Sequence, residues 1–359
     1  MGKKKQKAPV TPELILISDP NSDVDDLVSF VMAAVLADKG YFKLGGVVAT
    51  GGEMMTRLRR AMFSKGCFIE LGYPFLKVAV GADYPRRNGD ADNFYLSHPL
   101  SEAVERKGVV VERNVLRLFH SCVNAAEDKS LTIVANAQMS DVAAYLREAG
   151  AKNLKKFARI IVMGAYAPRE NDENPAVPDS SSYNNAVCMQ GAEELYQVAQ
   201  EKGVRLMFVP KDVIYQMQLG REFYDRLEKL SSPLAKLIAA ANKLCLENLW
   251  NAVRRGDYSH FDIRRFAKVF MGKDYKISSR VISGRESFEE IWPKIRYFNL
   301  YDVVTVMGAA DALFRQYGRF RRTSEKYMIY EAELSDPEGL KQALSDLIVE
   351  KLTPFRVSL

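Results

Sequence analysis

The stretch Leu14-Ile-Leu-Ile-Ser-Asp19-Pro-Asn21-Ser-Asp23-Val-Asp25-Asp26-Leu-Val-Ser-Phe30 contains four carboxylates within eight positions. The apolar run before them, residues 14–17, predicts a buried strand. After Asp26, apolar residues recur at helical spacing, which predicts a helix. The acidic residues therefore occupy a turn from a strand to a helix. In an open parallel sheet, ligands bind at such turns.

Two interpretations of this acidic turn are open. Asp25 and Asp26 can be first-turn residues that the helix dipole and the free backbone N–H groups stabilise. Capping accounts for one or two acids, whereas four in one turn repel each other unless a cation lies among them. A cation that prefers oxygen ligands, such as Ca²⁺, is the natural candidate. An EF-hand loop is excluded, because Val24 stands at its glycine position and Phe30 at its glutamate position.

The rest of the chain alternates strand-like and helix-like segments over 359 residues, of which 47% are hydrophobic. This alternation predicts an α/β fold with an open, mostly parallel sheet and helices on both faces, like a Rossmann core. We expect a disordered basic tail at 1–11 and a single α/β domain at 12–320. A C-terminal extension at 321–359 is expected to pack on the same domain.

Several classes of protein are not expected from the composition. There is no apolar run of 18 residues and no signal-peptide core, so we expect a cytoplasmic protein without membrane contact. The four cysteines are scattered without CxxC spacing, which argues against disulfides and zinc. The net charge of +6 is small, and no nucleic-acid partner is expected. The segment Gly46–Gly52 has Walker spacing but lacks its Lys and Ser/Thr, so a nucleotide phosphate site is not expected.

The acidic turn resembles the nucleoside hydrolases, which cleave the N-glycosidic bond of ribonucleosides. Their signature, Asp-x-Asp-x-x-x-Asp-Asp at the end of the first strand, matches Asp19, Asn21, Asp25 and Asp26 with one departure. The departure is Asn21, at the position which that family uses to activate water. The resemblance implies Asp19, Asn21 and Asp26 at a Ca²⁺ site and Asp25 at a ribose hydroxyl. Because a neutral amide is no base near neutral pH, Asp23 is the nearest substitute carboxylate.

Two further segments resemble parts of the metal site in that family. The strand end at 131–135 is followed by Asn136, whose backbone carbonyl would bind the metal, and by Ser140 or Asp141 as the predicted N-cap of a helix. Far downstream, Asp302 aligns with a ligating Asp, although capping alone also explains an acid there. The preceding His of the family is Tyr301 here, a weaker candidate for assisting the leaving base.

The segment 160–185 resembles the family's substrate-binding region. It gives Met163, at the end of a strand, and Asn174 as candidate substrate-binding residues. Where the family has Glu, an aromatic residue and Asn, this chain has Ser182-Tyr-Asn184. Asn184 can hydrogen-bond a sugar hydroxyl, whereas Ser182 removes a charged partner. For Asn185, a helix-capping role in a polar loop is an equally open interpretation.

Two functions follow as hypotheses. The first is a divergent Ca²⁺-dependent nucleoside hydrolase that acts on a ribonucleoside or related N-riboside, as in purine or pyrimidine salvage. Its catalytic candidates are Asn21, Asp23, Asp25 and Tyr301. The second is a catalytically inactive relative that binds metal and a ribose-containing ligand. In both, the partner is a small molecule, and the family resemblance implies a homodimer or homotetramer.

Overall fold

The computed structural model describes residues 11–20, 24–84, 99–257 and 261–353. The candidates Asn21 and Asp23 lie outside the described residues. The described part of the chain contains no helix long and apolar enough to cross a membrane.

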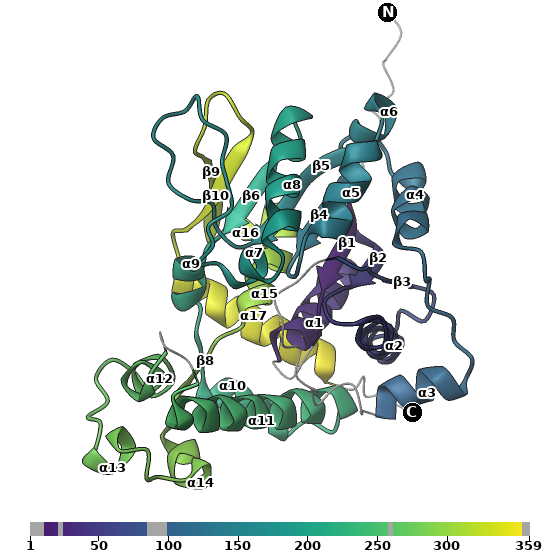
Figure 1. The fold of residues 1–359 in the computed structure, drawn as a ribbon. Helices are drawn as coiled ribbons and strands as arrows, with labels where there is room; N and C mark the ends of the chain where they lie inside the picture. The colour runs from purple at the N-terminus through teal and green to yellow at the C-terminus, as the bar shows by residue number, and fades with distance from the viewer. Residues whose placement is uncertain (1–10, 21–23, 85–98, 258–260, 354–359) are drawn as a thin grey trace, which may run out of the picture.

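The centre of the molecule is an eight-stranded sheet with the order β3-β2-β1-β4-β5-β6-β10-β9 (Figure 1). All neighbouring pairs are parallel except β9 and β10, which are antiparallel. The predicted mostly parallel sheet is therefore confirmed. Its strands are β1 (Glu13–Ser18), β2 (Lys43–Ala49), β3 (Lys77–Val80), β4 (Leu131–Ala135), β5 (Phe157–Met163), β6 (Leu206–Val209), β9 (Gly318–Arg322) and β10 (Ile329–Leu334). A separate pair joins β7 (Leu219–Gly220) to β8 (Tyr297–Phe298).

The first strand shows why its sequence is apolar at every position. Leu14 and Leu16 belong to the core on one face of the sheet, and Ile15 and Ile17 to the core on the other face. Successive strand residues point to opposite faces, so a strand covered on both sides has no polar alternation. The continuous apolar run is thus the signature of a sheet between two helical layers.

Helices cover both faces of the sheet. One layer contains α1 (Asp25–Asp38), α2 (Met54–Glu70), α15 (Tyr301–Ala309) and α17 (Pro337–Leu352). The other contains α4 (Val115–Ala125), α5 (Ser140–Glu148) and α8 (Met189–Glu201), with α5 beside α8 (Figure 1). A helical group at one end of the sheet consists of α10 (Arg221–Glu228), α11 (Pro233–Arg255), α12 (Ile263–Phe270), α13 (Ser279–Ile282) and α14 (Phe288–Ile291). The short helices are α3 (Pro99–Arg106), α6 (Ala151–Leu154), α7 (Tyr183–Val187), α9 (Lys211–Tyr215), α16 (Asp311–Phe314) and a 3₁₀ turn at Trp292–Lys294.

One local expectation, the N-cap at Ser140 or Asp141, was wrong. The N-cap of α5 is Met139, without a side-chain hydrogen bond, so Ser140 and Asp141 lie inside the helix. The Asp141 carboxylate instead accepts a hydrogen bond from the backbone N–H of Ala82 at 3.0 Å. The Asp141 side chain therefore bonds to the segment after β3 and does not cap α5.

The C-terminal part of the chain joins the main sheet. Strand β10 pairs in parallel with β6, and β9 forms the edge of the sheet. Helix α17 packs against α1, where Lys351 pairs with Asp38 at 2.6 Å and Lys39 with Glu350 at 2.8 Å. The last segment of the chain therefore buttresses the helix that follows the acidic turn.

Candidate functional site

The strand order places a ligand crevice beside β1. The chain runs from β1 to β2 and β3 on one side, and then continues from β4 to β6 on the other. At such a reversal the loops after two adjacent strands turn away from each other and leave a crevice at the carboxyl ends. A cavity of about 400 Å³ lies there. Nine candidates named from the sequence line it: Asp19, Asp25, Asp26, Asn136, Met163, Ser182, Asn184, Tyr301 and Asp302.

Three buried carboxylates converge in this cavity. One oxygen from each of Asp25, Asp26 and Asp302 lies within 4.8 Å of the others. The N-cap residues of α1 and α15 are Val24 and Leu300, and neither side chain caps its helix. Asp25 does accept the backbone N–H of Asp26 at 3.1 Å, so it contributes to the first turn of α1. Capping explains one of these acids, whereas their convergence from two distant helices fits a cation.

Asp26 is held in place from the end of β1. Its Oδ1 accepts hydrogen bonds from the Ser18 hydroxyl and from the backbone N–H of Asp19, the latter at 3.2 Å. Ser18 is the last residue of β1 and is fully buried. The strand end therefore orients the carboxylate directly, without a long flexible connection.

Asn136 joins β4 to the start of α15. Its Nδ2 donates to the Asp302 carbonyl at 3.3 Å, and its Oδ1 accepts from the Thr305 hydroxyl. Its own carbonyl faces another partner, Nδ2 of Asn184, at 2.9 Å. The Asn136 side chain is thus used to position Asp302. This leaves the second lone pair of its backbone carbonyl as the oxygen it can offer to a ligand.

Asn184 and Ser182 are both used within the wall of the cavity. Asn184 donates to the Met163 carbonyl at 3.2 Å as well as to Asn136. The Ser182 hydroxyl accepts the backbone N–H of Ala165 at 3.1 Å. Asn185 does not cap the helix that follows, since it lies inside α7 and donates to two loop carbonyls. The segment after β5 is therefore tied to the strand ends by its own side chains.

Tyr301 lies over the cavity beside a second phenol. Its hydroxyl accepts a hydrogen bond from Asn299 at 3.1 Å, and its ring meets that of Tyr215 edge to face at 6.3 Å. Burial, and then the neighbouring Tyr215, raise the pKa of Tyr301 well above its ordinary value. The phenol is therefore protonated near neutral pH and can donate a hydrogen bond.

A buried arginine, Arg60 of α2, joins the start of the acidic turn to the end of β2. The Arg60 guanidinium donates to the Pro20 carbonyl at 3.1 Å and to the Thr50 carbonyl at 3.0 Å, and Arg60 has no exposed surface. Gly51 has a φ of +73°, and a Cβ there would lie 2.5 Å from Nη1 of Arg60. Only glycine fits this close approach. Gly51, after β2, thus makes room for the arginine.

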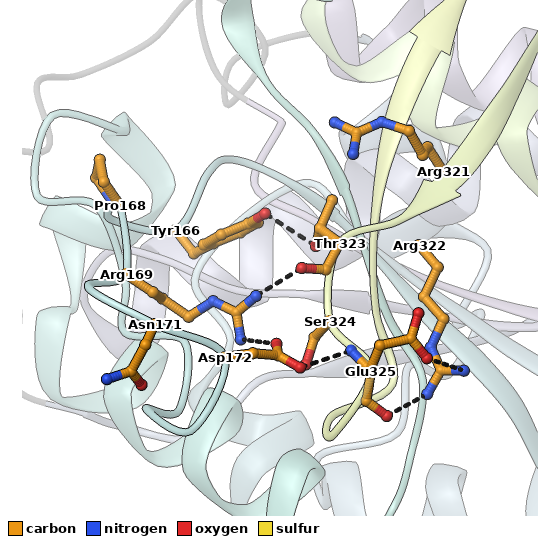
Figure 2. Close-up of a pocket in the computed structure, with 10 residues that line it drawn as sticks. All are labelled: Tyr166, Pro168, Arg169, Asn171, Asp172, Arg321, Arg322, Thr323, Ser324 and Glu325. Carbon is orange, nitrogen blue, oxygen red and sulfur yellow. Dashed lines mark hydrogen bonds and ion pairs between the residues drawn. The ribbon is translucent and has the colours of Figure 1, made fainter.

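The structure does not bring Asn174 to this cavity. Its carbonyl accepts a hydrogen bond from Arg169 at 3.4 Å. The Arg169 side chain faces Thr323 in the turn between β9 and β10 (Figure 2). Arg169 also donates to the Thr323 carbonyl at 2.7 Å and pairs with Asp172 at 3.1 Å. Asp172 in turn accepts the backbone N–H groups of Glu325 and Lys326. We call this set of contacts the loop clamp, because it fixes the 164–182 segment to the C-terminal hairpin.

The loop clamp surrounds a second, shallow cavity of about 540 Å³ (Figure 2). Its arginines form ion pairs. Arg321 pairs with Glu333, and Arg322 pairs with Glu325 at 3.8 Å. The Ser324 hydroxyl and neighbouring N–H groups hold the pKa of Asp172 at about 2. The charged groups around this cavity are thus engaged in ion pairs and hydrogen bonds.

Comparison with solved structures identifies the architecture. No protein-family model matches this sequence, and no curated protein matches it. Two solved effector proteins, XOO4466 and the type III effector XopQ complexed with adenosine diphosphate ribose, each share 27% identity with a TM-score of 0.80. The match covers 96% of this chain and 95% of theirs. A purine-preferring ribonucleoside hydrolase from Gardnerella vaginalis shares 17% identity and a TM-score of 0.59, over 95% of this chain and 99% of that one.

The chain has a nucleoside hydrolase-like fold. This confirms the resemblance noticed in the acidic turn.

Several residues of the nucleoside hydrolase-like cavity were not named from the sequence. Among them are Ser181, Lys211, Tyr215, Phe261 and Arg265. Lys211 follows β6 directly, and the rule that ligands bind at the carboxyl ends of parallel strands would have found it. Phe261 and Arg265 come from a helical group without a local motif. Only the tertiary structure brings them to the site.

Proposed function

We propose that this protein is a divergent Ca²⁺-dependent hydrolase of the N-glycosidic bond in a ribonucleoside or related N-riboside. The observation that carries the proposal is the convergence of Asp25, Asp26 and Asp302 in a cavity at the switch point of a nucleoside hydrolase-like fold. A volume of about 400 Å³ lies within the range of roughly 300–1,000 Å³ typical of small-molecule sites.

The donor set fits a hard cation. All of the groups are oxygens: the carboxylates of Asp26 and Asp302, with Asp19 beside them, and the backbone carbonyl of Asn136. No thiol or imidazole is among the described lining residues of the cavity. Carboxylate and carbonyl oxygens are the ligands that Ca²⁺ prefers. When bound, Ca²⁺ would hold sugar hydroxyls and lower the pKa of a coordinated water.

The protein's own groups would then divide the remaining work. Asp25 accepts a hydrogen bond from a ribose hydroxyl and Met163 packs against the ligand. Asp23 takes the proton from the attacking water, since Asn21 cannot. The water oxygen bonds to the anomeric carbon as the C–N bond breaks, through an oxocarbenium-like transition state. Tyr301 donates a hydrogen bond to the departing base, which takes up a proton from solvent, and Asp23 releases its proton to solvent.

A second candidate function is metal-dependent binding of a ribosyl ligand without turnover. Two observations favour it. Ser182 uses its hydroxyl on the backbone of Ala165, so no charged partner for the sugar stands there. XopQ, which shares 27% identity with this chain, was solved with adenosine diphosphate ribose. Both candidates need the same acidic centre and differ only in catalysis.

The decisive experiment measures both turnover and binding. Purified protein is incubated with a panel of nucleosides and other N-ribosides, in Ca²⁺ or in chelator, and release of the free base is followed by chromatography. We expect Ca²⁺-dependent release from at least one member and loss of release in Asp302→Asn. Glu148→Gln, which removes an exposed carboxylate at the far end of α5, should leave release unchanged. Calcium-dependent binding of the panel without any release would favour the second function.

A further inference from the structure

The cavity beside β1 has opposite charges in different parts of its wall. The converging carboxylates come from the start of α1 and from α15. Two cationic residues come from elsewhere: Lys211 from the start of α9 and Arg265 from α12. Both are exposed residues of the cavity wall. Within the described parts of the chain, no ion pair or hydrogen bond involves the amino group of Lys211.

A neutral nucleoside would give the Lys211 ammonium no anionic group to bind. Its ribose presents hydroxyls to the acidic centre, and its base presents apolar faces and neutral polar edges. A phosphorylated riboside has both a diol for the acidic centre and an anion for the cationic residues. Guanidinium and ammonium groups bind phosphate oxygens through charge-assisted hydrogen bonds, which are stronger than neutral ones.

The position of Arg265 is organised by its neighbours. Its backbone N–H is capped by the Asp262 carboxylate at 2.8 Å, and its guanidinium lies 5.6 Å from the centre of the Phe261 ring. A cation over an aromatic ring is held near that ring without losing its hydrogen-bond donors. Phe261 itself lines the cavity, so the ring keeps the guanidinium at the same wall.

We infer that the ligand of this site is a 5′-phosphorylated N-riboside, and that Lys211 and Arg265 bind its phosphate. The inference rests on the proposed function for the ribose end of the ligand. It differs from the expectation drawn from the glycine-rich segment at 46–52, which concerned a phosphate-binding loop. Here the phosphate would be bound by the side chains of Lys211 from α9 and Arg265 from α12, and not by the loop after β2.

The test compares each nucleoside with its own 5′-monophosphate. Adenosine, inosine, uridine and cytidine and their monophosphates are titrated calorimetrically into wild type, Lys211→Gln, Arg265→Gln and the double variant. Free Ca²⁺ is held constant, since phosphate also binds the ion. We expect wild type to prefer at least one monophosphate by tenfold or more. Each single variant should reduce that preference about tenfold, as expected for the loss of one charge-assisted contact.

Matched control variants remove positive charges at the amino ends of the strands, away from the cavity. Arg205 immediately precedes β6, whereas Lys211 follows it, and Lys152 lies in α6 before β5. Both are exposed. Arg205→Gln and Lys152→Gln should leave the monophosphate preference as in wild type. A fall in those variants would assign the effect to net charge and overturn the inference.

The remaining outcomes separate this inference from the proposed function. Release of base from neutral nucleosides, with no preference for monophosphates, overturns the inference and keeps the hydrolase. A monophosphate preference that depends on Lys211 and Arg265, without base release, keeps the inference and removes the hydrolase. Equal losses of nucleoside and monophosphate binding in the variants also overturn the inference. If no member of either series binds, both proposals fail.

Discussion

At the scale of single residues, the departure at Asn21 decides whether the site can catalyse. Asn21 and Asp23 both lie outside the described residues, and the prediction therefore rests on the proton affinities of an amide and a carboxylate. If Asp23 is the base, Asp23→Ala should abolish base release, and Asn21→Asp should add little. If no base is present, Asn21→Asp should raise release about 10²–10⁴-fold, the usual contribution of general-base catalysis. Calcium binding, measured by calorimetry, should persist in Asp23→Ala.

One outcome would contradict both alternatives, Asp23 as the base and a site that lacks only its base. If Asn21→Asp and Asp23→Ala leave a nucleoside panel unhydrolysed while calcium still binds, the base is not the missing element. The substitutions at Ser182 and Tyr301 would then have removed the remaining catalytic groups. The binding function would replace the hydrolase.

Asp141 gives a pH-dependent prediction at the same scale. Burial raises the pKa of this carboxyl to about 6, although the N–H of Ala82 opposes the shift. A raised pKa means that the folded state holds the proton more tightly, so the stabilisation is present at low pH and is lost as pH rises from about 4 to 6. At about 1.4 kcal/mol per unit, the shift from 3.8 to about 6 corresponds to about 3 kcal/mol.

The substitution Asp141→Asn removes this titration and keeps an oxygen that can accept from Ala82. Relative to the variant, wild type should therefore lose about 3 kcal/mol of stability between pH 3.5 and pH 7. Urea unfolding of both proteins across that range measures the difference. A constant difference between them would show that Asp141 does not titrate in this way.

At the scale of elements, the loop clamp links the C-terminal hairpin to the 164–182 segment, whose two ends line the cavity beside β1. The Arg169 side chain is 10% exposed and contacts Asp172, Asn174 and Thr323. Arg169→Ala leaves those groups with fewer partners, and we expect a loss of about 1–3 kcal/mol. Amide hydrogen exchange should rise in residues 164–182 before it rises in β4 or β5, since the clamp contacts only the loop.

The control for the clamp is Arg205→Ala, an exposed arginine at the amino end of β6. Its exchange pattern should match wild type. Arg169→Lys should restore little, because a single ammonium cannot replace the forked guanidinium contacts. Unchanged exchange across 164–182 in Arg169→Ala would mean that the hairpin does not position this segment.

At the scale of the whole molecule, calcium should stabilise the fold. A ligand that binds only the native state adds RT ln(1 + [L]/Kd), about 2.7 kcal/mol at a hundredfold excess over Kd. The melting temperature should thus rise by several degrees in Ca²⁺ and return in chelator. Asp26→Asn should abolish the rise, whereas Glu148→Gln should retain it. An identical melting temperature with and without Ca²⁺ would argue against the metal site.

The assembly of the chain is a separate prediction. The family resemblance implies a dimer or tetramer, so light scattering at micromolar concentration should give two or four times the chain mass of 40.5 kDa. A mass near that of one chain would exclude it. The described surface offers exposed apolar side chains such as Phe75 and Val110 for mutational tests of the contact.

The sequence by itself determined the layered fold and the acidic turn. Apolar runs such as residues 14–17 and helical spacing after Asp26 encode local structure, and a signature within eight residues needs no knowledge of distant contacts. The family resemblance also found Asp302 and Asn136, because each follows or opens an element in a short motif. Such local patterns can be recognised without knowledge of the tertiary structure.

Only the tertiary structure decided which distant residues share the cavity. Phe261 comes from the segment before α12 and Arg265 from α12, and no local pattern relates them to β1. Asn174 follows a plausible motif, yet the loop clamp holds it elsewhere. The physical reason is that strand order and helix packing, set by burial over the whole chain, determine which loop ends meet. A sequence pattern fixes an element, whereas a site depends on how the elements are arranged around one crevice.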